Sequence, residues 1–212
     1  MNALYDITPC TLLDFRGVPA AIFWFAGCNL RCSYCYNPEI VFSHAKISQQ
    51  EALAFLEKRK GLLEGVVLSG GEATLYSHIE AFAAKIKKTG FKIKLDTNAT
   101  RPRVLQKLLD ASLLEYVALD YKGLEDSDEE LFWESYRLLA RSGIDFEVRT
   151  TYHSRLIPKE KLLGMYEKLS KAGYKKEYYV QPVRSNVATI GDIEEETMRS
   201  FAWIESFATL RA

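Results

Sequence analysis

Three of the four cysteines lie close enough in sequence to hold a metal centre together. Cys28, Cys32 and Cys35 have the spacing C-x3-C-x2-C. Reduced thiols at such a spacing indicate metal ligation before disulfide bonding. Three thiolates can bind three irons of a cubane 4Fe–4S cluster, whereas a cluster used only for electron transfer is normally held by four protein ligands. The fourth iron would be open to an external ligand, and an open iron can take part in chemistry on that ligand.

A zinc site is the main alternative interpretation of these cysteines. His44 is the nearest histidine and would complete a Cys3His set. Zinc ribbons and fingers usually split their ligands into two pairs, whereas here all three thiols share one loop. The pattern therefore favours an iron–sulfur cluster. Cys10 stands apart, and we interpret it as a small, semi-buried apolar side chain.

The cysteine segment follows the first of six short apolar segments, and helix-like segments alternate with them. We expect strands over residues 21–26, 66–68, 92–95, 116–119, 146–151 and 178–180. We expect helices over residues 48–60, 78–88, 102–110, 128–141, 158–171 and 193–210. Ser48 with Glu51 predicts a capping box at the first helix, and Pro102 is a typical residue for the first position of a helix.

This alternation predicts an α/β fold with a parallel sheet and right-handed crossovers. The sheet could be an open doubly wound sheet or a curved partial barrel. In both folds, functional groups collect at the carboxyl ends of the strands. The length of 212 residues, with no linker-like or low-complexity stretch, predicts a single domain over residues 1–212.

Composition excludes some classes of partner. Lys plus Arg and Asp plus Glu both number 28, so no basic excess points to nucleic acid and no acidic tail points to a basic partner. The N-terminus lacks a signal-peptide pattern, and the longest apolar run near it, residues 18–27, is too short to span a bilayer. We therefore expect a cytoplasmic protein with no membrane partner.

Polar residues follow the next three expected strands, at the same edge of the sheet as the cysteines. The segments are Ser69-Gly70-Gly71-Glu72, Asp96-Thr97-Asn98 and Asp120-Tyr121-Lys122. A glycine pair lets backbone approach a ligand closely, and a carboxylate can accept from an ammonium group. An ordinary Gly-Gly turn, a turn cap and a surface ion pair are the respective structural alternatives.

The fifth expected strand carries Arg149 and is followed by His153. An arginine inside a buried strand needs an anionic partner, so Arg149 either faces a ligand or makes a structural salt bridge. His153 and Gln181 are weaker candidates at strand ends, and a lone histidine is more often a surface residue. We interpret Phe23, Trp24 and Phe25 as core.

The cysteine segment, with Tyr34 giving C-x3-C-x-aromatic-C, resembles the signature of the radical S-adenosylmethionine (SAM) superfamily. The resemblance implies a partial (βα)6 TIM-like barrel with parallel strands. It also implies that the amino and carboxylate groups of SAM chelate the open iron, and that an electron splits SAM into methionine and a 5′-deoxyadenosyl radical. Gly70, Gly71 and Glu72 would contact the methionine amino group, and Tyr34 would lie near the adenine.

Four segments, CNLRCSYCYN, SGGEATL, LDTNAT and ALDYK, resemble the activating enzymes of glycyl radical enzymes. Similar proteins serve anaerobic ribonucleotide reductase and pyruvate formate-lyase. The site residues that this resemblance implies are Asp96, Thr97 and Asp120 as ligands of a monovalent cation or the SAM carboxylate, with Asn98, Lys122, Arg149 and His153 around SAM. The sequence departs from the pattern at Ala73, Ala99 and Tyr121, where proline, glycine and an apolar residue are common.

We therefore expect an enzyme that abstracts a Cα hydrogen from a glycine of a partner glycyl radical enzyme. Flavodoxin or ferredoxin would donate the electron. The first alternative is a radical SAM enzyme that acts on a small molecule such as a modified purine precursor. The second is a zinc-binding structural module.

Overall fold

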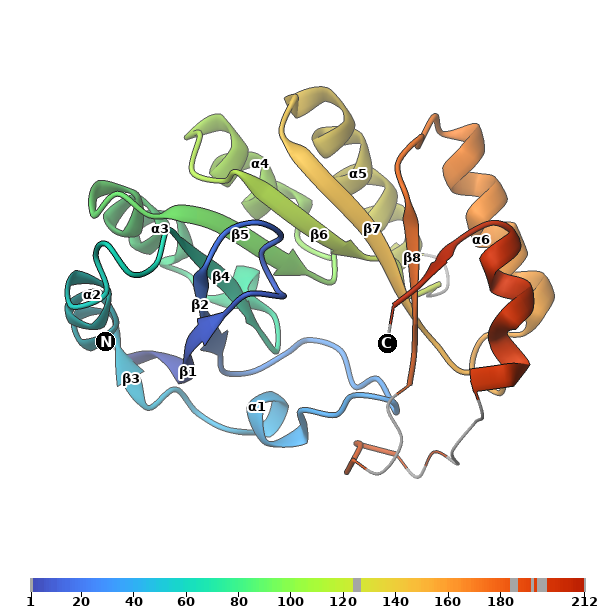
Figure 1. Cartoon of the computed structure of the whole chain (residues 1–212), viewed down its shortest axis with the longest axis horizontal. Helices are drawn as coiled ribbons and strands as arrows, with labels where there is room; N and C mark the ends of the chain where they lie inside the picture. The colour runs from blue at the N-terminus through green and yellow to red at the C-terminus, as the bar shows by residue number, and fades with distance from the viewer. Residues whose placement is uncertain (1, 124–126, 184–186, 192, 194–197, 212) are drawn as a thin grey trace.

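The computed structural model describes residues 2–123, 127–183, 187–191, 193 and 198–211. Its strands form one nine-stranded sheet in the order β3-β1-β2-β4-β5-β6-β7-β8-β9 (Figure 1). The strands are β1 (Asn2–Thr11), β2 (Ala20–Phe25), β3 (Ile47–Ser48), β4 (Gly65–Gly70), β5 (Lys92–Thr97), β6 (Tyr116–Asp120), β7 (Asp145–Tyr152), β8 (Tyr178–Pro182) and β9 (Thr209–Leu210).

Helices cover the convex face of this curved sheet (Figure 1). They are α2 (Gln49–Glu57), α3 (Ile79–Lys88), α4 (Pro102–Asp110), α5 (Ser127–Ser142) and α6 (Lys159–Lys171). A short helix α1 (Pro38–Phe42) and the 3-10 helices η1 (Ala73–Leu75) and η2 (Met198–Ser206) complete the described set. No helix among the described residues is long and apolar enough to cross a membrane.

The strand order decides between the two sheet forms that the sequence left open. From β2 to β9, neighbouring strands are parallel and follow chain order without reversal. A doubly wound sheet would reverse its order at a switch point. The fold is therefore a curved partial barrel, as the sequence pattern allowed.

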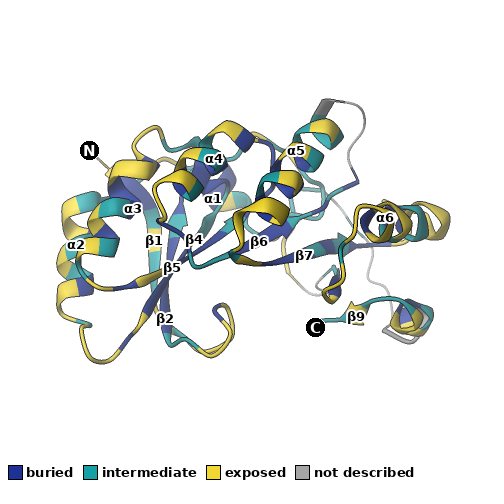
Figure 2. Cartoon of the chain, turned by 90° about the horizontal axis from the view of Figure 1, so that it is seen from above, coloured by how far each residue is buried: buried dark blue, intermediate teal, exposed yellow. Residues whose placement is uncertain are grey.

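The two faces of the barrel strands differ in chemistry. Outward-facing residues such as Phe23, Leu68 and Leu95 belong to the main apolar core between sheet and helices. Figure 2 shows this core as buried residues along the strands and on the helix faces that meet them. The concave face carries polar and charged side chains, with a small apolar cluster around Phe15 and Ile22.

The six expected strands and the first five expected helices are present, and the capping box of Ser48 and Glu51 is confirmed. Two expectations need correction. The sheet is not entirely parallel, because β1 pairs antiparallel with both β2 and β3. The helix expected over residues 193–210 is wrong in type and length: η2 is a 3-10 helix, and residues 209–210 form β9 because they pair with β8. Residues 194–197 of that expectation lie outside the described residues.

Candidate active site

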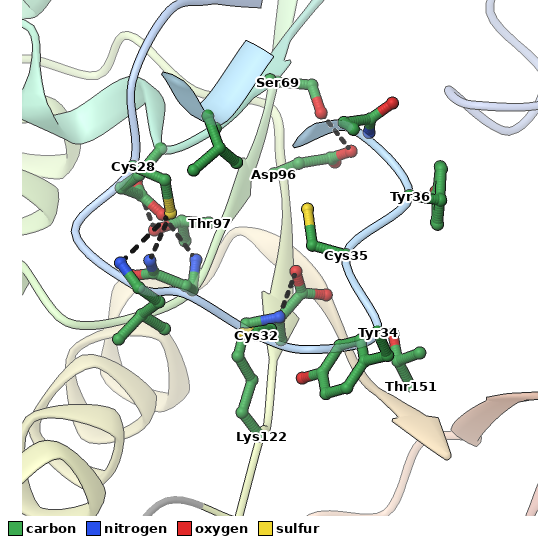
Figure 3. Close-up of a pocket in the computed structure, with 18 of the residues that line it drawn as sticks. Cys28, Cys32, Tyr34, Cys35, Tyr36, Ser69, Asp96, Thr97, Lys122 and Thr151 are labelled. Carbon is green, nitrogen blue, oxygen red and sulfur yellow. Dashed lines mark hydrogen bonds and ion pairs between the residues drawn. The ribbon is translucent and has the colours of Figure 1, made fainter. Parts of the chain in front are cut away.

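A pocket at the carboxyl ends of the barrel strands gathers nearly all the predicted site residues (Figure 3). The predicted residues that line it are Cys28, Cys32, Tyr34, Cys35, Gly70, Gly71, Glu72, Asp96, Thr97, Asn98, Asp120, Lys122 and Arg149. Gln181 lines it too. These side chains come from five strands and the loop after β2, so tertiary structure converts separate sequence motifs into one site.

The loop that carries the cysteines, residues 27–37, is called the cysteine loop below. It packs directly on the glycine pair that ends β4. The carbonyl oxygen of Gly27 accepts a hydrogen bond from the Glu72 backbone N–H at 2.9 Å. A Cβ placed on Gly71 would lie 1.9 Å from that oxygen. Only glycine at position 71 therefore allows the cysteine loop to approach β4 so closely.

The three thiols fit a cluster held at three corners. Cys28, Cys32 and Cys35 are free and partly exposed to the pocket, and the described lining contains neither a fourth cysteine nor a histidine. Among the described residues, no three Cys, His, Asp or Glu side chains converge closely enough to hold a single ion. In a cubane, each thiolate binds a different iron, so its sulfurs need not meet at one point. His44, the candidate fourth zinc ligand, is exposed and does not line the pocket.

Glu72 is buried and engaged by its surroundings. Its Oε1 accepts from the backbone N–H of Thr74 at 3.0 Å, from Thr74 Oγ1 at 2.5 Å and from Thr97 Oγ1 at 2.9 Å. Its Oε2 accepts from the backbone N–H of Asn98 at 2.7 Å. Burial raises the pKa of Glu72, while these donors oppose the rise. Glu72 thus joins β4, η1 and the end of β5, and its contact with an amino group remains a prediction.

A row of alternating charges, here called the charge ladder, crosses β5, β6 and β7 on the concave face. It consists of Lys94, Asp96, Arg149, Asp120 and Lys122. Lys94 Nζ lies 3.1 Å from Asp96 Oδ1, and Arg149 Nη2 lies 3.4 Å from Asp96 Oδ2. Arg149 Nε pairs with Asp120 Oδ1, and Lys122 Nζ lies 3.6 Å from Asp120 Oδ2. The anionic partners that Arg149 required are therefore Asp96 and Asp120.

These contacts decide the charge states of the carboxylates. Burial alone would raise the pKa of Asp96, but Arg149 and Lys94 outweigh it and hold the pKa below its ordinary value. Burial opposes ionisation of Asp120 in the same way, and Arg149 with Lys122 lowers its pKa. Three cations against two carboxylates leave one surplus positive charge, which suits an anionic ligand group.

The monovalent cation that the resemblance implies near Asp96 and Asp120 remains a prediction. Each oxygen of Asp96 and Asp120 already faces a cationic side chain, and Asp96 Oδ2 also accepts from Ser69 Oγ at 3.2 Å. A further cation would add to the surplus positive charge. We derive no step that uses one.

Tyr34 and Lys122 lie together beside Cys32 in Figure 3. Lys122 Nζ is 5.6 Å from the centre of the Tyr34 ring, within the range of a cation–π contact. Burial raises the pKa of Tyr34, so its hydroxyl stays protonated. Burial would lower the pKa of Lys122, but the neighbouring Asp120 carboxylate helps to raise it overall, so Lys122 stays charged.

His153 is the predicted site residue that the structure does not bring into the pocket. It is 3% exposed and lies in the turn after β7, where its Nδ1 accepts from the Arg155 backbone N–H at 3.3 Å. It is therefore neither the surface residue nor the pocket residue that the sequence suggested. Its contact with adenosine has no support from the described lining.

Several lining residues were not predicted. They are Asp14, Ile22, Trp24, Leu30, Tyr36, Asn37, Val41, Ser69 and Thr151. The assignment of Trp24 to the apolar core with Phe23 and Phe25 needs correction. Trp24 points to the concave face, where its Nε1 donates to Thr8 Oγ1 at 2.8 Å. Alternation along β2 could have separated it from its neighbours, because successive strand residues point to opposite faces.

Two departures from the family pattern have a structural account. Tyr121 is buried on the helix side of β6, where its ring stacks on Phe132 at a centroid distance of 4.1 Å, so it lies outside the pocket. Ala99 has a φ of 66°, in the left-handed region that favours glycine. The chain therefore carries backbone strain at Ala99.

A curved parallel barrel with three free thiols and buried ion pairs at its mouth is the arrangement expected of an enzyme with a three-cysteine cluster site. The family model described as the radical SAM superfamily matches residues 22–183. The chain belongs to the radical SAM superfamily, which implies a 4Fe–4S cluster and SAM. Cys28, Cys32 and Cys35 are the residues that would hold the cluster.

The chain is also similar to individual proteins that have names or solved structures. The chain is 28% identical over 175 residues to a Methanocaldococcus jannaschii protein named "Putative glycyl-radical enzyme activating enzyme", covering 76% of this chain and 72% of that one. It is 28% identical over 109 residues to 7-carboxy-7-deazaguanine synthase of Haemophilus influenzae, covering 51% and 46%. The crystal structure of Streptococcus suis SuiB bound to S-adenosylmethionine has a TM-score of 0.65 at 14% identity, covering 88% of this chain and 45% of SuiB. The matched region thus spans less than half of the last two proteins, and SuiB supports the fold alone.

Proposed function

We propose that this protein activates a glycyl radical enzyme by using SAM to generate a radical on a glycine of that partner. The observation that carries the proposal is the pocket in which three free thiols of one loop meet the charge ladder. The similarity to a protein named as a glycyl-radical enzyme activating enzyme supports the choice of partner. Anaerobic ribonucleotide reductase and pyruvate formate-lyase types are the partners that the sequence motifs suggest.

When bound, the cluster supplies one electron that splits SAM into methionine and a 5′-deoxyadenosyl radical. This chemistry would remove a hydrogen atom from a glycine Cα, giving 5′-deoxyadenosine and leaving the unpaired electron on the partner. Flavodoxin or ferredoxin is the proposed source of the electron. We infer that residues 1–212 act as one radical SAM domain. The cytoplasmic location expected from the sequence remains a prediction.

The chain's own residues have distinct roles in this proposal. Cys28, Cys32 and Cys35 hold the cluster, and the surplus charge near Lys122 and Arg149 orients the carboxylate of SAM. The sheet ends in two unpaired described edges, β3 and β9, and so is not a closed barrel. A protein segment can approach an open sheet, and a glycine brings no side chain that would block the radical.

The test compares Cys32→Ala with Cys10→Ala, both purified without oxygen. Cys10 is exposed on β1, so the interpretation of it as semi-buried is wrong. It does not line the pocket and is therefore a matched thiol control. Wild type and Cys10→Ala should contain about four irons per chain and form 5′-deoxyadenosine with a chemical reductant. Cys32→Ala should do neither. Release of 5′-deoxyadenosine by Cys32→Ala would contradict the ligand assignment.

The partner is tested separately by electron paramagnetic resonance on a candidate glycyl radical enzyme mixed with this protein, SAM and reductant. A glycyl radical signal that needs all components supports the proposal. The similarity to 7-carboxy-7-deazaguanine synthase favours a second candidate function, which is radical chemistry on a small heterocycle. Turnover of such a compound without any protein partner would favour that second function.

A further inference from the structure

The side-chain amide of Asn98 has a defined orientation at the end of β5. Its Oδ1 accepts from the backbone N–H of Thr100 at 3.1 Å and from Thr100 Oγ1 at 2.7 Å. Its Nδ2 donates to Asn29 Oδ1 at 3.0 Å and contacts Cys28 Sγ at 3.9 Å. Both amide hydrogens and both oxygen lone pairs have partners. Exchanging the oxygen and nitrogen would set the Thr100 N–H against an N–H and the carbonyl against Asn29 Oδ1, so the assignment of the donor is secure.

The backbone that carries Asn98 is also held in place. Its N–H donates to the buried carboxylate of Glu72, and the residue is 6% exposed. Asn29 Nδ2 donates in return to Thr100 Oγ1 at 2.8 Å, which joins the cysteine loop to the end of β5 by a second bond. The side-chain Nδ2–H of Asn98 is therefore aimed at the Cys28 sulfur by hydrogen bonds that need no ligand.

Cys28 receives a second donor from its own loop. The backbone N–H of Leu30 lies 3.4 Å from Cys28 Sγ. Figure 3 shows Cys28 with the donor groups around it. Donors to a cluster thiolate stabilise the more negative, reduced state of the cluster, which raises its reduction potential.

We propose that Asn98 tunes the reduction potential of the cluster through its N–H···S hydrogen bond to Cys28, and so acts as a positioning residue. The inference rests on the proposed ligation by Cys28. It assigns Asn98 a role beyond the SAM contact that the family resemblance implies. Glu72 and the backbone N–H of Thr100 serve the same end, because they hold the Asn98 backbone and side-chain amide in the orientation that donates.

The test uses Asn98→Asp and Asn98→Ala. Aspartate keeps an oxygen for Thr100 but places an acceptor where the sulfur needs a donor, and alanine removes the side chain's bonds. The midpoint potential is measured by reductive titration followed by electron paramagnetic resonance, without SAM. Both variants should retain wild-type iron and show a midpoint shifted to more negative potential, with the larger shift for Asn98→Asp.

Thr100→Val is the matched control, because it removes the hydroxyl contacts of the same loop but keeps the Thr100 backbone N–H that orients the Asn98 amide. It should keep the wild-type midpoint. Three results would overturn the inference: an unchanged midpoint in Asn98→Ala, an equal shift in Thr100→Val, or loss of iron from both Asn98 variants, which would show that Asn98 only shapes the loop. Absence of iron from the wild-type protein would instead overturn the proposed function.

Discussion

Arg149 separates two buried carboxylates that would otherwise repel each other. Its side chain is 16% exposed and pairs with Asp96 and Asp120, which are 11% and 24% exposed. Removing one partner from a buried ion network typically costs about 3–5 kcal/mol, because uncompensated charges are left behind. We expect Arg149→Met to lose about that much unfolding free energy at neutral pH, as measured by urea denaturation. Lys92→Met, which breaks the exposed pair with Glu64, should cost less than about 1 kcal/mol.

Arg149→Met should also reverse the pH dependence of the unfolding free energy. In the wild type, the lowered pKa values of Asp96 and Asp120 give stability that is present above the ordinary aspartate pKa of about 3.9 and is lost as pH falls through the folded values. Without Arg149, burial and mutual repulsion should place at least one pKa above the unfolded value. The variant should then be more stable near pH 5 than near pH 7. Parallel pH profiles for variant and wild type would contradict the charge ladder.

Gly71 tests the close contact between β4 and the cysteine loop. A Cβ at this position would meet the Gly27 carbonyl, so Gly71→Ala must push the cysteine loop away. We expect a loss of about 1–3 kcal/mol of stability and poor iron incorporation, measured by denaturation and iron analysis. Gly164→Ala in α6 meets nothing within 4 Å and should be stabilising by about 0.5–1 kcal/mol. Equal iron contents in the two variants would contradict the contact.

At this scale, the sequence predicted the residues that have distinctive chemistry at distinctive spacing. The cysteines, the glycine pair and the Asp-x-Lys segment lie where strand ends should bring them. Lys94 was missed because it precedes the motif by two residues, although period-two alternation along β5 places it on the same face as Asp96. The partners of Arg149 could not be read from sequence, because they depend on the register of β5, β6 and β7.

Among the elements, the segment of residues 187–191 has a role that the sequence did not suggest. It follows β8 and lies against the cysteine loop. The backbone N–H of Ile190 donates to the Cys35 carbonyl at 3.1 Å, and that of Gly191 donates to the Ser33 carbonyl at 2.8 Å. These bonds hold the cysteine loop at Ser33 and Cys35, whereas Gly71 contacts it at Gly27.

We expect Gly191→Ala to loosen this hold. Its Cβ would lie 2.9 Å from Ser33 Cβ, so the two segments must separate and the hydrogen bonds weaken. Reconstituted Gly191→Ala should lose iron to a chelator faster than wild type, while Gly164→Ala should match wild type. The global unfolding midpoint should change little, because the segment contributes few buried side chains. Equal rates of iron loss would show that residues 187–191 do not support the cluster site.

Elements with strong local signals were predicted well. The capping box at α2 and Pro102 at the start of α4 act within one turn, so the sequence alone predicts them. The strands β3 and β9 have two residues each and exist because β1 and β8 offer edges to pair with. Such short pairings depend on tertiary position, and no local pattern could have predicted them.

For the whole molecule, an ion pair reinforces the backbone pairing of the last strand of the sheet. Arg211, just after β9, pairs with Glu147 of β7 at 2.9 and 3.0 Å, and its guanidinium lies 3.6 Å from the centre of the Tyr179 ring in β8. Glu147 is 6% exposed. Arg211 thus ties the β9 edge of the open barrel to the concave face, on the strands that also carry Arg149 and Gln181.

Arg211→Met should therefore weaken this edge. It leaves the Glu147 carboxylate buried without its cation, but the Arg211 side chain is 36% exposed, so solvent screening limits the expected cost to about 1–2 kcal/mol. Adding Glu147→Gln should recover part of that loss, because the buried charge disappears. Lys171→Met, which breaks the exposed pair with Glu167, should change stability by less than about 0.5 kcal/mol. SAM cleavage by folded Arg211→Met should stay at the wild-type rate, since Arg211 does not line the pocket. A loss of cleavage without a loss of stability would show instead that the β9 edge takes part in shaping the active site.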